Sequence, residues 1–303
     1  MSYIYYPGCS LKSTGRSYEE SMLAVFRELQ IPLAELDDWN CCGATAYMSI
    51  SELKAFALSA RNFALAEKQN GHDETVEMVV PCAACYLGLS KARRYLQEFP
   101  DIKLTIDKAL QEGGLEYKGI VNIRHPLDIL INDIGLDKIK ESVKRPLEGL
   151  KIACYYGCQI VRPYAEFDKQ HDPQTMDQLM KALGAATVDW PLKTRCCGGS
   201  LTGTIQDVGL RLSYMILREA RNRGCDMVAT ACPLCQFNLE CYQDKMARLF
   251  GEKVNIPVVY FTQLMGLALG LSSRELGISR LFTPVKFIGK DNGTTGGKYV
   301  SVK

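Results

Sequence analysis

The thirteen cysteines of this 303-residue chain are the side chains best suited to chemistry. Disulfide frameworks of such density belong to small secreted domains, whereas in a reducing cytosol the same density indicates metal binding or redox chemistry. Ten of the cysteines form two ordered sets of five, one in each half of the chain: Cys9, Cys41, Cys42, Cys82 and Cys85, then Cys158, Cys196, Cys197, Cys232 and Cys235. We predict that each set holds a metal centre.

The two sets repeat one pattern. In each half a Gly-Cys dipeptide is followed by a Cys-Cys-Gly tripeptide and then by a Cys-x-x-Cys motif, and the three blocks recur at offsets of 149, 155 and 150 residues. The surroundings repeat as well, because residues 5–9 read YYPGC and residues 155–158 read YYGC. Three ordered blocks at a nearly constant offset indicate an internal duplication.

The number of thiols in each set favours a multinuclear centre. A structural zinc ion takes four ligands, and a common iron–sulfur cubane takes four cysteines in a C-x2-C-x2-C-x3-C-P run, which is absent here. The neighbours Cys41 and Cys42 would form a strained ring around one small ion, but they reach different irons of a larger cluster. We expect Gly43 and Gly198, which follow the two Cys-Cys pairs, to let the backbone approach the sulfide closely. Zinc in one half is the main alternative.

Three cysteines lie outside the repeat: Cys154, Cys225 and Cys241. Free cysteine is often a small buried hydrophobic residue, and we expect this of all three. Cys154 competes with Cys158 for the ligand role, but only Cys158 follows a glycine, as Cys9 does. Between Cys158 and the next cysteine block lie 37 residues, closer to the 31 residues between Cys9 and Cys41 than the 41 residues that follow Cys154.

The segments around the cysteines predict the elements that position them. Apolar runs at residues 76–80 and 227–230 lead into the two Cys-x-x-Cys motifs, and helix-like stretches follow at residues 86–98 and 236–250. Helical patterns also follow the other blocks, at residues 16–30, 51–69, 173–183 and 203–223. Short strands separated by such helices predict an α/β fold of two pseudo-symmetric repeated units with mainly parallel sheets. The cysteines would lie at strand C-termini and helix N-termini, where helix dipoles stabilise anionic thiolates.

The length of the chain suits two domains of ordinary size. A polar linker over residues 112–151, with a helix-like piece at residues 127–131, places the boundary near residue 148. We predict an N-terminal repeat with its linker over residues 1–148 and a C-terminal repeat over residues 149–288. Residues 289–303 would form a flexible tail or docking segment.

Composition and charge argue against several classes of function. With 47% hydrophobic and 23% charged residues, the chain is typical of a soluble globular protein. Its formal net charge of +2 gives no reason to expect nucleic acid or an anionic membrane surface as a partner. The sequence shows neither an apolar run long enough for a membrane span nor the layout of a signal peptide, so we expect a cytoplasmic protein.

The cysteine pattern resembles the signature of the CCG-domain family of cysteine-rich redox proteins. In each copy 31 or 37 residues separate a cysteine from a Cys-Cys-Gly tripeptide, and a further 38 or 33 residues separate the tripeptide from a Cys-x-x-Cys motif. A chain of this length with both copies is similar to the family of B subunits found in the heterodisulfide reductases of methanogenic archaea. The similarity includes residues 5–9, 81–86, 156–158, 267–271 and 275–277 and covers the chain up to about residue 282. The extra cysteines and the tail are departures from the family.

The resemblance implies a cofactor, a reaction and partners. Each set of five cysteines would bind a noncubane [4Fe-4S] cluster, and the mixed disulfide of coenzyme M and coenzyme B would be reduced to two thiols between the two clusters. The chain would be the catalytic subunit of an electron-bifurcating complex of methanogenesis. Its partners there would be the iron–sulfur C subunit and the flavin-containing A subunit of heterodisulfide reductase, with a hydrogenase or formate dehydrogenase. The chain has no G-x-G-x-x-G fingerprint, so we expect it to bind neither flavin nor NAD and to receive electrons from its partners.

Such a substrate carries a sulfonate, a carboxylate and a phosphate, so basic residues should line its pocket. The candidates closest in sequence to the cysteines are Lys12, Arg16, Arg162, Lys193 and Arg195. His125 and His171 are candidates for donating protons to the leaving thiolates. Each of these residues also has an ordinary interpretation as a surface or structural side chain.

Two other functions fit the same residues. Another CCG-domain electron-transfer subunit, of lactate or glycolate oxidation or of thiol:fumarate reduction, would use the cysteine sets as a relay. A zinc-stabilised scaffold would use them for structure alone. An anaerobic count of iron, sulfide and zinc in native protein separates the scaffold from the other two functions.

Overall fold

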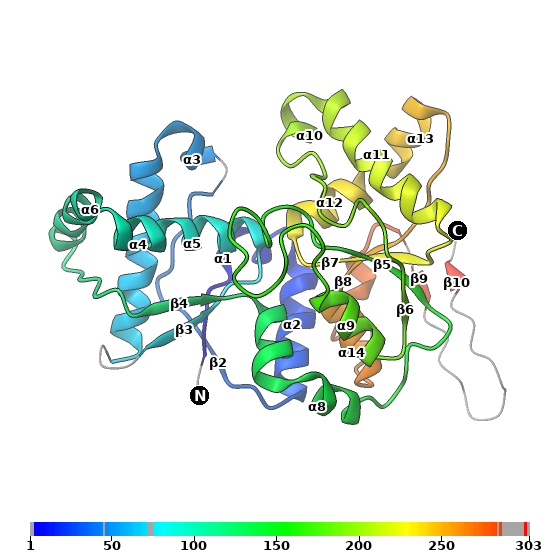
Figure 1. The fold of residues 1–303 in the computed structure, drawn as a ribbon, viewed down its shortest axis with the longest axis horizontal. Coiled ribbons are helices and arrows are strands. Elements are labelled where there is room, and N and C mark those ends of the chain that lie inside the picture. Colours follow the sequence, from blue (N-terminus) through cyan, green and yellow to red (C-terminus); the bar gives the residue numbers. More distant parts are fainter. Residues whose placement is uncertain (1–2, 45, 72–74, 284, 287–299, 302–303) are drawn as a thin grey trace. The chain divides into compact units, whose positions relative to one another are not determined.

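The computed structural model describes residues 3–44, 46–71, 75–283, 285–286 and 300–301 of the chain. The chain forms two compact units, the first made of Met1–Ser13 and Gln30–Pro126 and the second of Thr14–Leu29 and Leu127–Lys303. Each unit contains its own four-stranded parallel sheet (Figure 1). The predicted α/β fold of two repeated units is therefore confirmed.

The sheet of the first unit has the order β2-β1-β3-β4. Its strands are β1 (Tyr3–Tyr5), β2 (Leu33–Glu35), β3 (Val76–Val79) and β4 (Val121–Arg124). The central strand β1 aligns Ile4 with Ala34 of β2 and with Met78 of β3. The inner strands β1 and β3 are short apolar runs because a parallel sheet covered by helices buries both faces. The helices of this unit are α1 (Gly8–Leu11), α3 (Ala46–Ile50), α4 (Glu52–Gln69), α5 (Ala83–Glu98) and α6 (Pro100–Glu112).

The sheet of the second unit repeats this topology strand for strand, in the order β6-β5-β7-β8. Its strands are β5 (Lys151–Tyr155), β6 (Ala186–Thr187), β7 (Met227–Thr230) and β8 (Val258–Tyr260). Its main helices are α9 (Thr175–Ala182), α10 (Leu201–Thr204), α11 (Gln206–Asn222), α12 (Pro233–Cys241), α13 (Gln243–Phe250) and α14 (Phe261–Ala268). Figure 1 shows α9 and α14 on one side of this sheet and α11 and α12 on the other.

Helix α2 (Arg16–Glu28) comes from the N-terminal repeat but packs in the second unit. The ring of Tyr18 stacks on that of Tyr260 with centroids 4.4 Å apart, and Ser21 Oγ lies 2.6 Å from Thr262 Oγ1. Arg280 and the α2 residue Glu20 form an ion pair of 2.8 Å. The compact units therefore differ from the two halves of the sequence, and the boundary at residue 148 stays a prediction about the repeats.

The remaining elements lie in the linker and near the C-terminus. The linker contains α7 (Pro126–Asp128), the π-helix η1 (Ile129–Ile134) and α8 (Leu136–Glu141), and a 3-10 helix, η2 (Ile278–Arg280), follows α14. The helix predicted over residues 236–250 forms two helices, α12 and α13, with Tyr242 between them. Of the predicted tail, residues 289–303, only two lie within the described residues, and they form β10 (Val300–Ser301), which pairs antiparallel with β9 (Val285–Lys286).

Candidate functional site

The cysteines of each unit follow the C-terminal ends of its first three strands in sequence. In the first unit Cys9 lies in α1 just after β1, the pair Cys41–Cys42 lies in the loop after β2, and Cys82 is the N-cap residue of α5 after β3. In the second unit Cys158 follows β5, the pair Cys196–Cys197 follows β6, and Cys232, after β7, is the N-cap residue of α12. Because the C-terminal ends of parallel strands share one edge of a sheet, this topology gathers each set at one place.

The five sulfur atoms of the first unit form one connected group. Cys42 Sγ lies 3.1 Å from Cys85 Sγ, and Cys41 Sγ lies 3.9 Å from Cys9 Sγ. Cys82 joins the group through a side-chain hydrogen bond to Cys85, and Cys41 and Cys42 are hydrogen-bonded to each other. All five predicted thiols of this half are therefore together.

The second unit brings its five thiols together in the same way. Cys197 Sγ lies 3.6 Å from Cys235 Sγ, and Cys235 is also hydrogen-bonded to Cys232. Cys196 is hydrogen-bonded both to Cys158 and to Cys197. The structure therefore places Cys158 in the group.

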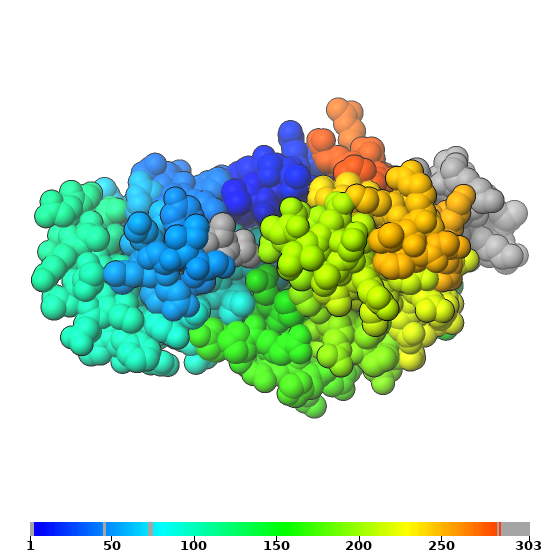
Figure 2. All heavy atoms as spheres, turned by 90° about the horizontal axis from the view of Figure 1, so that it is seen from above, coloured from blue at the N-terminus to red at the C-terminus, as the bar shows by residue number. Residues whose placement is uncertain are grey.

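The two groups also match in burial. In each unit the second cysteine of the Cys-Cys pair and both cysteines of the Cys-x-x-Cys motif are buried. These are Cys42, Cys82 and Cys85 in the first unit, and Cys197, Cys232 and Cys235 in the second. Cys9, Cys41 and Cys196 are exposed, and Cys158 is half-buried. Figure 2 shows the yellow-green segment with α10 and the start of α11, which follows Cys196 and Cys197, open on the face in view. Each group thus has a buried base of three sulfurs and an accessible side of two.

The thiols of the first group shift one another's pKa. Hydrogen bonds from Cys41 and then Cys85 lower the pKa of Cys42 well below its usual range. The hydrogen bond between Cys41 and Cys42 raises the pKa of Cys41, and the separate hydrogen bond between Cys85 and Cys42 raises that of Cys85. The neighbouring protonated thiols therefore stabilise the Cys42 thiolate, and a metal centre bound there would displace their protons.

Two glycines with positive φ lie directly against the sulfurs. At Gly8, with φ +67°, a Cβ would come within 3.1 Å of Cys85 Sγ, and at Gly157, with φ +70°, it would come within 3.1 Å of Cys235 Sγ. Only glycine combines this backbone conformation with so close an approach. These glycines precede Cys9 and Cys158. The repeated Gly-Cys dipeptide is therefore explained by the lack of space for a side chain beside the sulfur.

The glycines of the Cys-Cys-Gly blocks lie against the helices that follow the cysteine loops. A Cβ at Gly43 would meet Leu58 and Ala55 of α4, at 3.2 and 3.4 Å, and one at Gly198 would meet the backbone of Gly209 on α11 at 2.9 Å. These glycines let the following helix approach the cysteine loop.

Two tyrosines that the sequence analysis did not single out as site residues hold the cysteine pairs in place. The hydroxyl of Tyr6 donates to the carbonyl of Asn40 at 2.8 Å, and the hydroxyl of Tyr155 donates to the carbonyl of Arg195 at 2.5 Å. Both acceptors immediately precede a Cys-Cys pair. Burial, followed by the nearby thiols, raises the pKa of both tyrosines, so their hydroxyls keep the donated proton. The repeated YY before Gly-Cys was the available signal.

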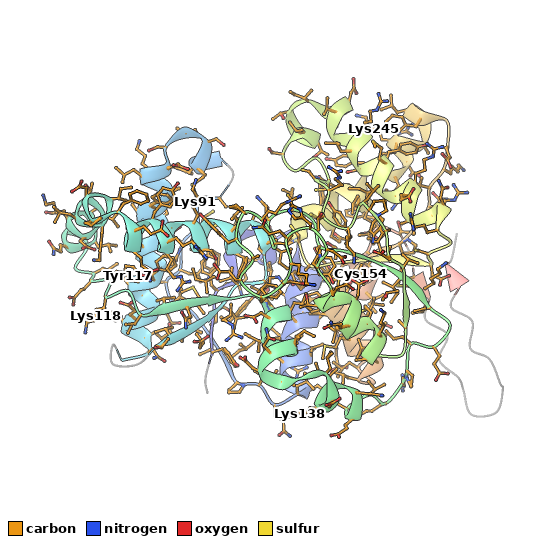
Figure 3. The ribbon with its side chains drawn as sticks, in the orientation of Figure 1. Lys91, Tyr117, Lys118, Lys138, Cys154 and Lys245 are labelled. Atoms are coloured by element: carbon orange, nitrogen blue, oxygen red, sulfur yellow. The ribbon has the colours of Figure 1, made fainter. Side chains whose placement is uncertain are left out.

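The three spare cysteines lie apart from the two groups. Cys154 is buried on β5, where its carbonyl accepts a hydrogen bond of 3.0 Å from Trp190 Nε1 (Figure 3). Burial raises the pKa of the Cys154 thiol, and its charged neighbours are Asp177 and Lys193. Burial likewise raises the pKa of Cys225, to about 11. Cys154 is therefore buried as expected, whereas Cys225 and Cys241 are only half-buried.

Lys193, a predicted substrate-binding residue, lies in the interior of the second unit with 3% of its surface exposed. Its Nζ lies 3.5 Å from Asp177 Oδ2 and 3.3 Å from Asp172 Oδ1, and it donates to the carbonyl of Pro173 at 3.1 Å. Asp177 in turn accepts the hydroxyl proton of Tyr156 at 2.7 Å. The charge of Lys193 is thus neutralised within the protein, which sequence proximity to Cys196 did not reveal.

The other basic candidates differ in their surroundings. Arg162 donates to the carbonyl of Thr194 and is close enough to Cys196 to help lower the pKa of that thiol, whose main cause is the hydrogen bond from Cys158. Arg195 is exposed and adjoins Cys196 in the chain. Lys12 and Arg16 are paired with the carboxylates of Glu35, at 2.8 Å, and Glu20, at 3.1 Å. Arg162 and Arg195 are therefore the basic residues best placed beside the second group.

The two candidate proton donors also differ. His125 follows β4 and is fully buried, with Nε2 3.1 Å from the carbonyl of Pro81, the residue before Cys82. Its ring meets that of Tyr86 edge-on at 5.8 Å. His171 is exposed in the loop before α9. His125 therefore supports the Cys-x-x-Cys turn, whereas His171 is accessible.

The donor set fits an iron–sulfur centre better than a single ion. Five soft sulfur donors exceed the four of a tetrahedral zinc site, and thiolates are the usual ligands of iron–sulfur clusters. In the part of the chain that the structure describes, no three or more Cys, His, Asp or Glu side chains are arranged to hold one metal ion. The fit rests on the number of thiols, their grouping and their accessible side.

Comparison with known proteins agrees with this geometry. The model of the CCG cysteine-rich domain matches residues 3–90 and again residues 152–240. The chain belongs to this family. Among curated relatives of this CCG-domain protein is the B subunit of the Ferredoxin/F(420)H(2)-dependent CoB-CoM heterodisulfide reductase of Methanosarcina acetivorans, which is 32% identical over 278 residues, 90% of this chain and 91% of that protein. The 8-methylmenaquinol:fumarate reductase membrane anchor subunit of Wolinella succinogenes is 31% identical over 279 residues, 91% of this chain and 95% of that protein.

A solved structure shares the fold. A hypothetical protein from Helicobacter pylori aligns with 95% of this chain at a TM-score of 0.76 and 16% identity, and the CCG-domain chain spans about half, 53%, of that longer chain. The likeness shows the fold alone. Among the described residues, no helix has the length and apolar character needed to cross a membrane. Together the comparisons support an electron-transfer role in an oxidoreductase complex.

Proposed function

We propose that this protein reduces the mixed disulfide of coenzyme M and coenzyme B, using one noncubane [4Fe-4S] cluster held by each group of five cysteines. The observation that carries the proposal is the match between the groups: each has three buried sulfurs and two accessible ones at the same place in two like sheets. Two centres suit the reaction, because a disulfide takes up two electrons and two protons to give two thiols. When bound, such a cluster supplies single electrons at low potential.

The chain's own residues have three tasks in this proposal. The buried cysteines anchor each centre, and the accessible ones, Cys9 and Cys41 in the first unit and Cys158 and Cys196 in the second, leave one side open to substrate. Arg162 and Arg195 attract the anionic groups of the substrate, and Arg guanidinium binds phosphate and carboxylate in a bidentate manner. Lys12 is the corresponding candidate in the first unit. His171, which is exposed, is the candidate acid.

The partners are proposed from the relatives and from what the chain lacks. The sequence has no nucleotide-binding fingerprint, so electrons would come from the iron–sulfur C subunit and the flavin-containing A subunit of such a complex, joined to a hydrogenase or formate dehydrogenase. The Methanosarcina acetivorans relative is the B subunit of a Ferredoxin/F(420)H(2)-dependent CoB-CoM heterodisulfide reductase, which supports assembly of this chain into a heterodisulfide reductase complex.

The decisive test is anaerobic. Native or reconstituted protein should contain about eight irons per chain with matching sulfide, two clusters of four. It should oxidise a reduced viologen dye only when the coenzyme M–coenzyme B disulfide is added. Cys42→Ser and Cys197→Ser should each lose about half of the iron, whereas Cys241→Ser, outside both groups, should keep all of it. Full iron content without disulfide-dependent oxidation would refute the substrate, and zinc without iron would refute the centres.

A second function is favoured by one specific observation. The Wolinella relative, which belongs to a quinol:fumarate reductase, is as similar to this chain as the heterodisulfide reductase relatives and matches along nearly its whole length. In that case the centres would relay electrons, and the native complex would reduce fumarate with a menaquinol analogue while ignoring the heterodisulfide. The two assays on one preparation separate the functions.

A further inference from the structure

The two cysteine groups differ at one side chain that contacts sulfur. Asn238 lies on α12 three residues after Cys235, is fully buried, and its Nδ2 lies 3.4 Å from Cys197 Sγ. The offset of 150 residues that relates the two Cys-x-x-Cys motifs assigns Gly88 to this position in the first unit. Glycine has no side chain, so the first group lacks this contact.

The orientation of the Asn238 amide follows from its other partners. Nδ2 donates to the carbonyl of Gly199 at 2.9 Å, and Oδ1 accepts the hydroxyl proton of Thr202 at 2.8 Å. A carbonyl oxygen only accepts hydrogen bonds, so the NH2 group must face Gly199. The same NH2 group has a second hydrogen, which points to the sulfur. Asn238 is therefore a fixed donor to Cys197.

The packing beside the two positions has changed in a reciprocal way. A Cβ at Gly88 would lie 3.2 Å from the Cβ of Ala44, so an asparagine there has no room. In the second unit the residue equivalent to Ala44 is Gly199, by the 155-residue offset of the Cys-Cys-Gly blocks, and it leaves the space that Asn238 uses. In the second unit a small loop residue, Gly199, thus lies beside a large helix residue, Asn238. In the first unit the helix residue is the small one, Gly88, and the loop residue, Ala44, is larger.

The other donors to sulfur are shared between the units. Ala44 N donates to Cys42 in the first unit at 3.4 Å, and the backbone of Gly199 donates to Cys197 in the second. The hydroxyl of Tyr6 also contacts Cys42, but its single proton goes to the carbonyl of Asn40. Among the described residues, the amide of Asn238 is therefore the side-chain donor that distinguishes the second Cys-Cys pair from the first.

Hydrogen bonds to cluster sulfurs and their ligands make the reduced, more negative state easier to reach. We infer that Asn238 is a positioning residue that acts through Cys197 to give the second iron–sulfur centre a higher reduction potential than the first. This inference rests on the proposed function. The second centre is then reduced before the first when a partner supplies electrons.

The test is a potentiometric titration of the iron-loaded full chain, followed by electron paramagnetic resonance. The wild type should show two transitions at different potentials. Asn238→Leu, which keeps the volume, and Asn238→Ala should both lower the upper transition by about a tenfold change in the ratio of reduced to oxidised centre, about 59 mV for one electron, and leave the lower one in place. Thr202→Val is the matched control, because it removes a partner of the amide oxygen and keeps the donor, and should move neither transition.

The outcomes separate the inference from the proposed function. Wild-type protein without iron refutes the centres. Iron-loaded Asn238 variants whose upper transition does not move, or moves as much in Thr202→Val, overturn the inference alone. If the Asn238 variants do not hold iron, the double variant Ala44→Gly/Gly88→Asn decides, because it installs the donor in the first unit. It should raise the lower transition, and an unmoved transition overturns the inference.

Discussion

The contact between Gly157 and Cys235 permits a sharp test of how the backbone shapes the cysteine groups. Gly157→Ala places a methyl group 3.1 Å from Cys235 Sγ at a φ of +70°. A left-handed conformation costs a non-glycine residue about 1–2 kcal/mol, and overpacking a filled site costs about 1–3 kcal/mol. The expected loss of unfolding free energy is therefore about 2–5 kcal/mol.

Gly251 is the matched control for this change. It has the same φ of +70° in the same unit, and a Cβ there meets nothing within 4 Å. Gly251→Ala should cost only the backbone part, about 1–2 kcal/mol. The assay is anaerobic denaturant unfolding with an iron count on each variant, and Gly157→Ala should also lose iron that Gly251→Ala retains. Equal losses of stability and equal iron content in the two variants would refute a steric role for the contact with sulfur.

Three further predictions concern single side chains in the second unit. Cys158→Ser should lower iron content by about half while Cys154→Ser leaves it unchanged, and the reverse result in an iron assay would make Cys154 the ligand. Lys193→Met should lower unfolding free energy by about 3 kcal/mol at neutral pH, because the buried Asp177 carboxyl loses its cation, and denaturant unfolding that shows no loss would contradict the pairing. Burial raises the pKa of Glu240 from 4.5 to about 7. Since the folded state then favours the protonated form, the stability contribution of this group is complete below about pH 4.5 and declines by about 3 kcal/mol as pH rises to about 7. Glu240→Gln should remove that part of the pH dependence between pH 5 and 8, and unfolding curves with an unchanged pH slope would show that the carboxyl is not buried in this way.

Much of the architecture was predictable because one constraint acts on both halves. Cysteines that must converge on one centre have to occupy the same edge of a sheet, so their spacing indicated the strands, the helices and the repeat. Apolar runs before Cys82 and Cys232 completed the pattern, and both became central strands. The grouping of the ten thiols follows from this topology.

Other features depend on contacts that spacing does not encode. Gly43 and Gly198 adjoin cysteines in the chain, but their free side faces a helix, which only the packing of α4 and α11 reveals. Lys193 resembles a surface residue in the sequence because its partner Asp177 lies 16 positions earlier. Asn238 stands out only once its contact with Cys197 Sγ is known, and the sequence offset then assigns Gly88 to the equivalent position.

The packing of α2 in the second unit, rather than in the first, also affects how the protein folds during synthesis. The apolar face of this helix, with Tyr18, Met22 and Phe26, is fully buried in the complete chain, and it packs on α14, whose first residue is Phe261. During synthesis about 230 residues separate the two helices, so at about 5–20 residues per second α2 waits on the order of 10–50 s for its partner. The first unit must close around Gln30–Pro126 while that face is still uncovered. A ribosome-bound chain stalled before residue 261 should therefore depend on chaperones, although both of its cysteine sets have already been translated.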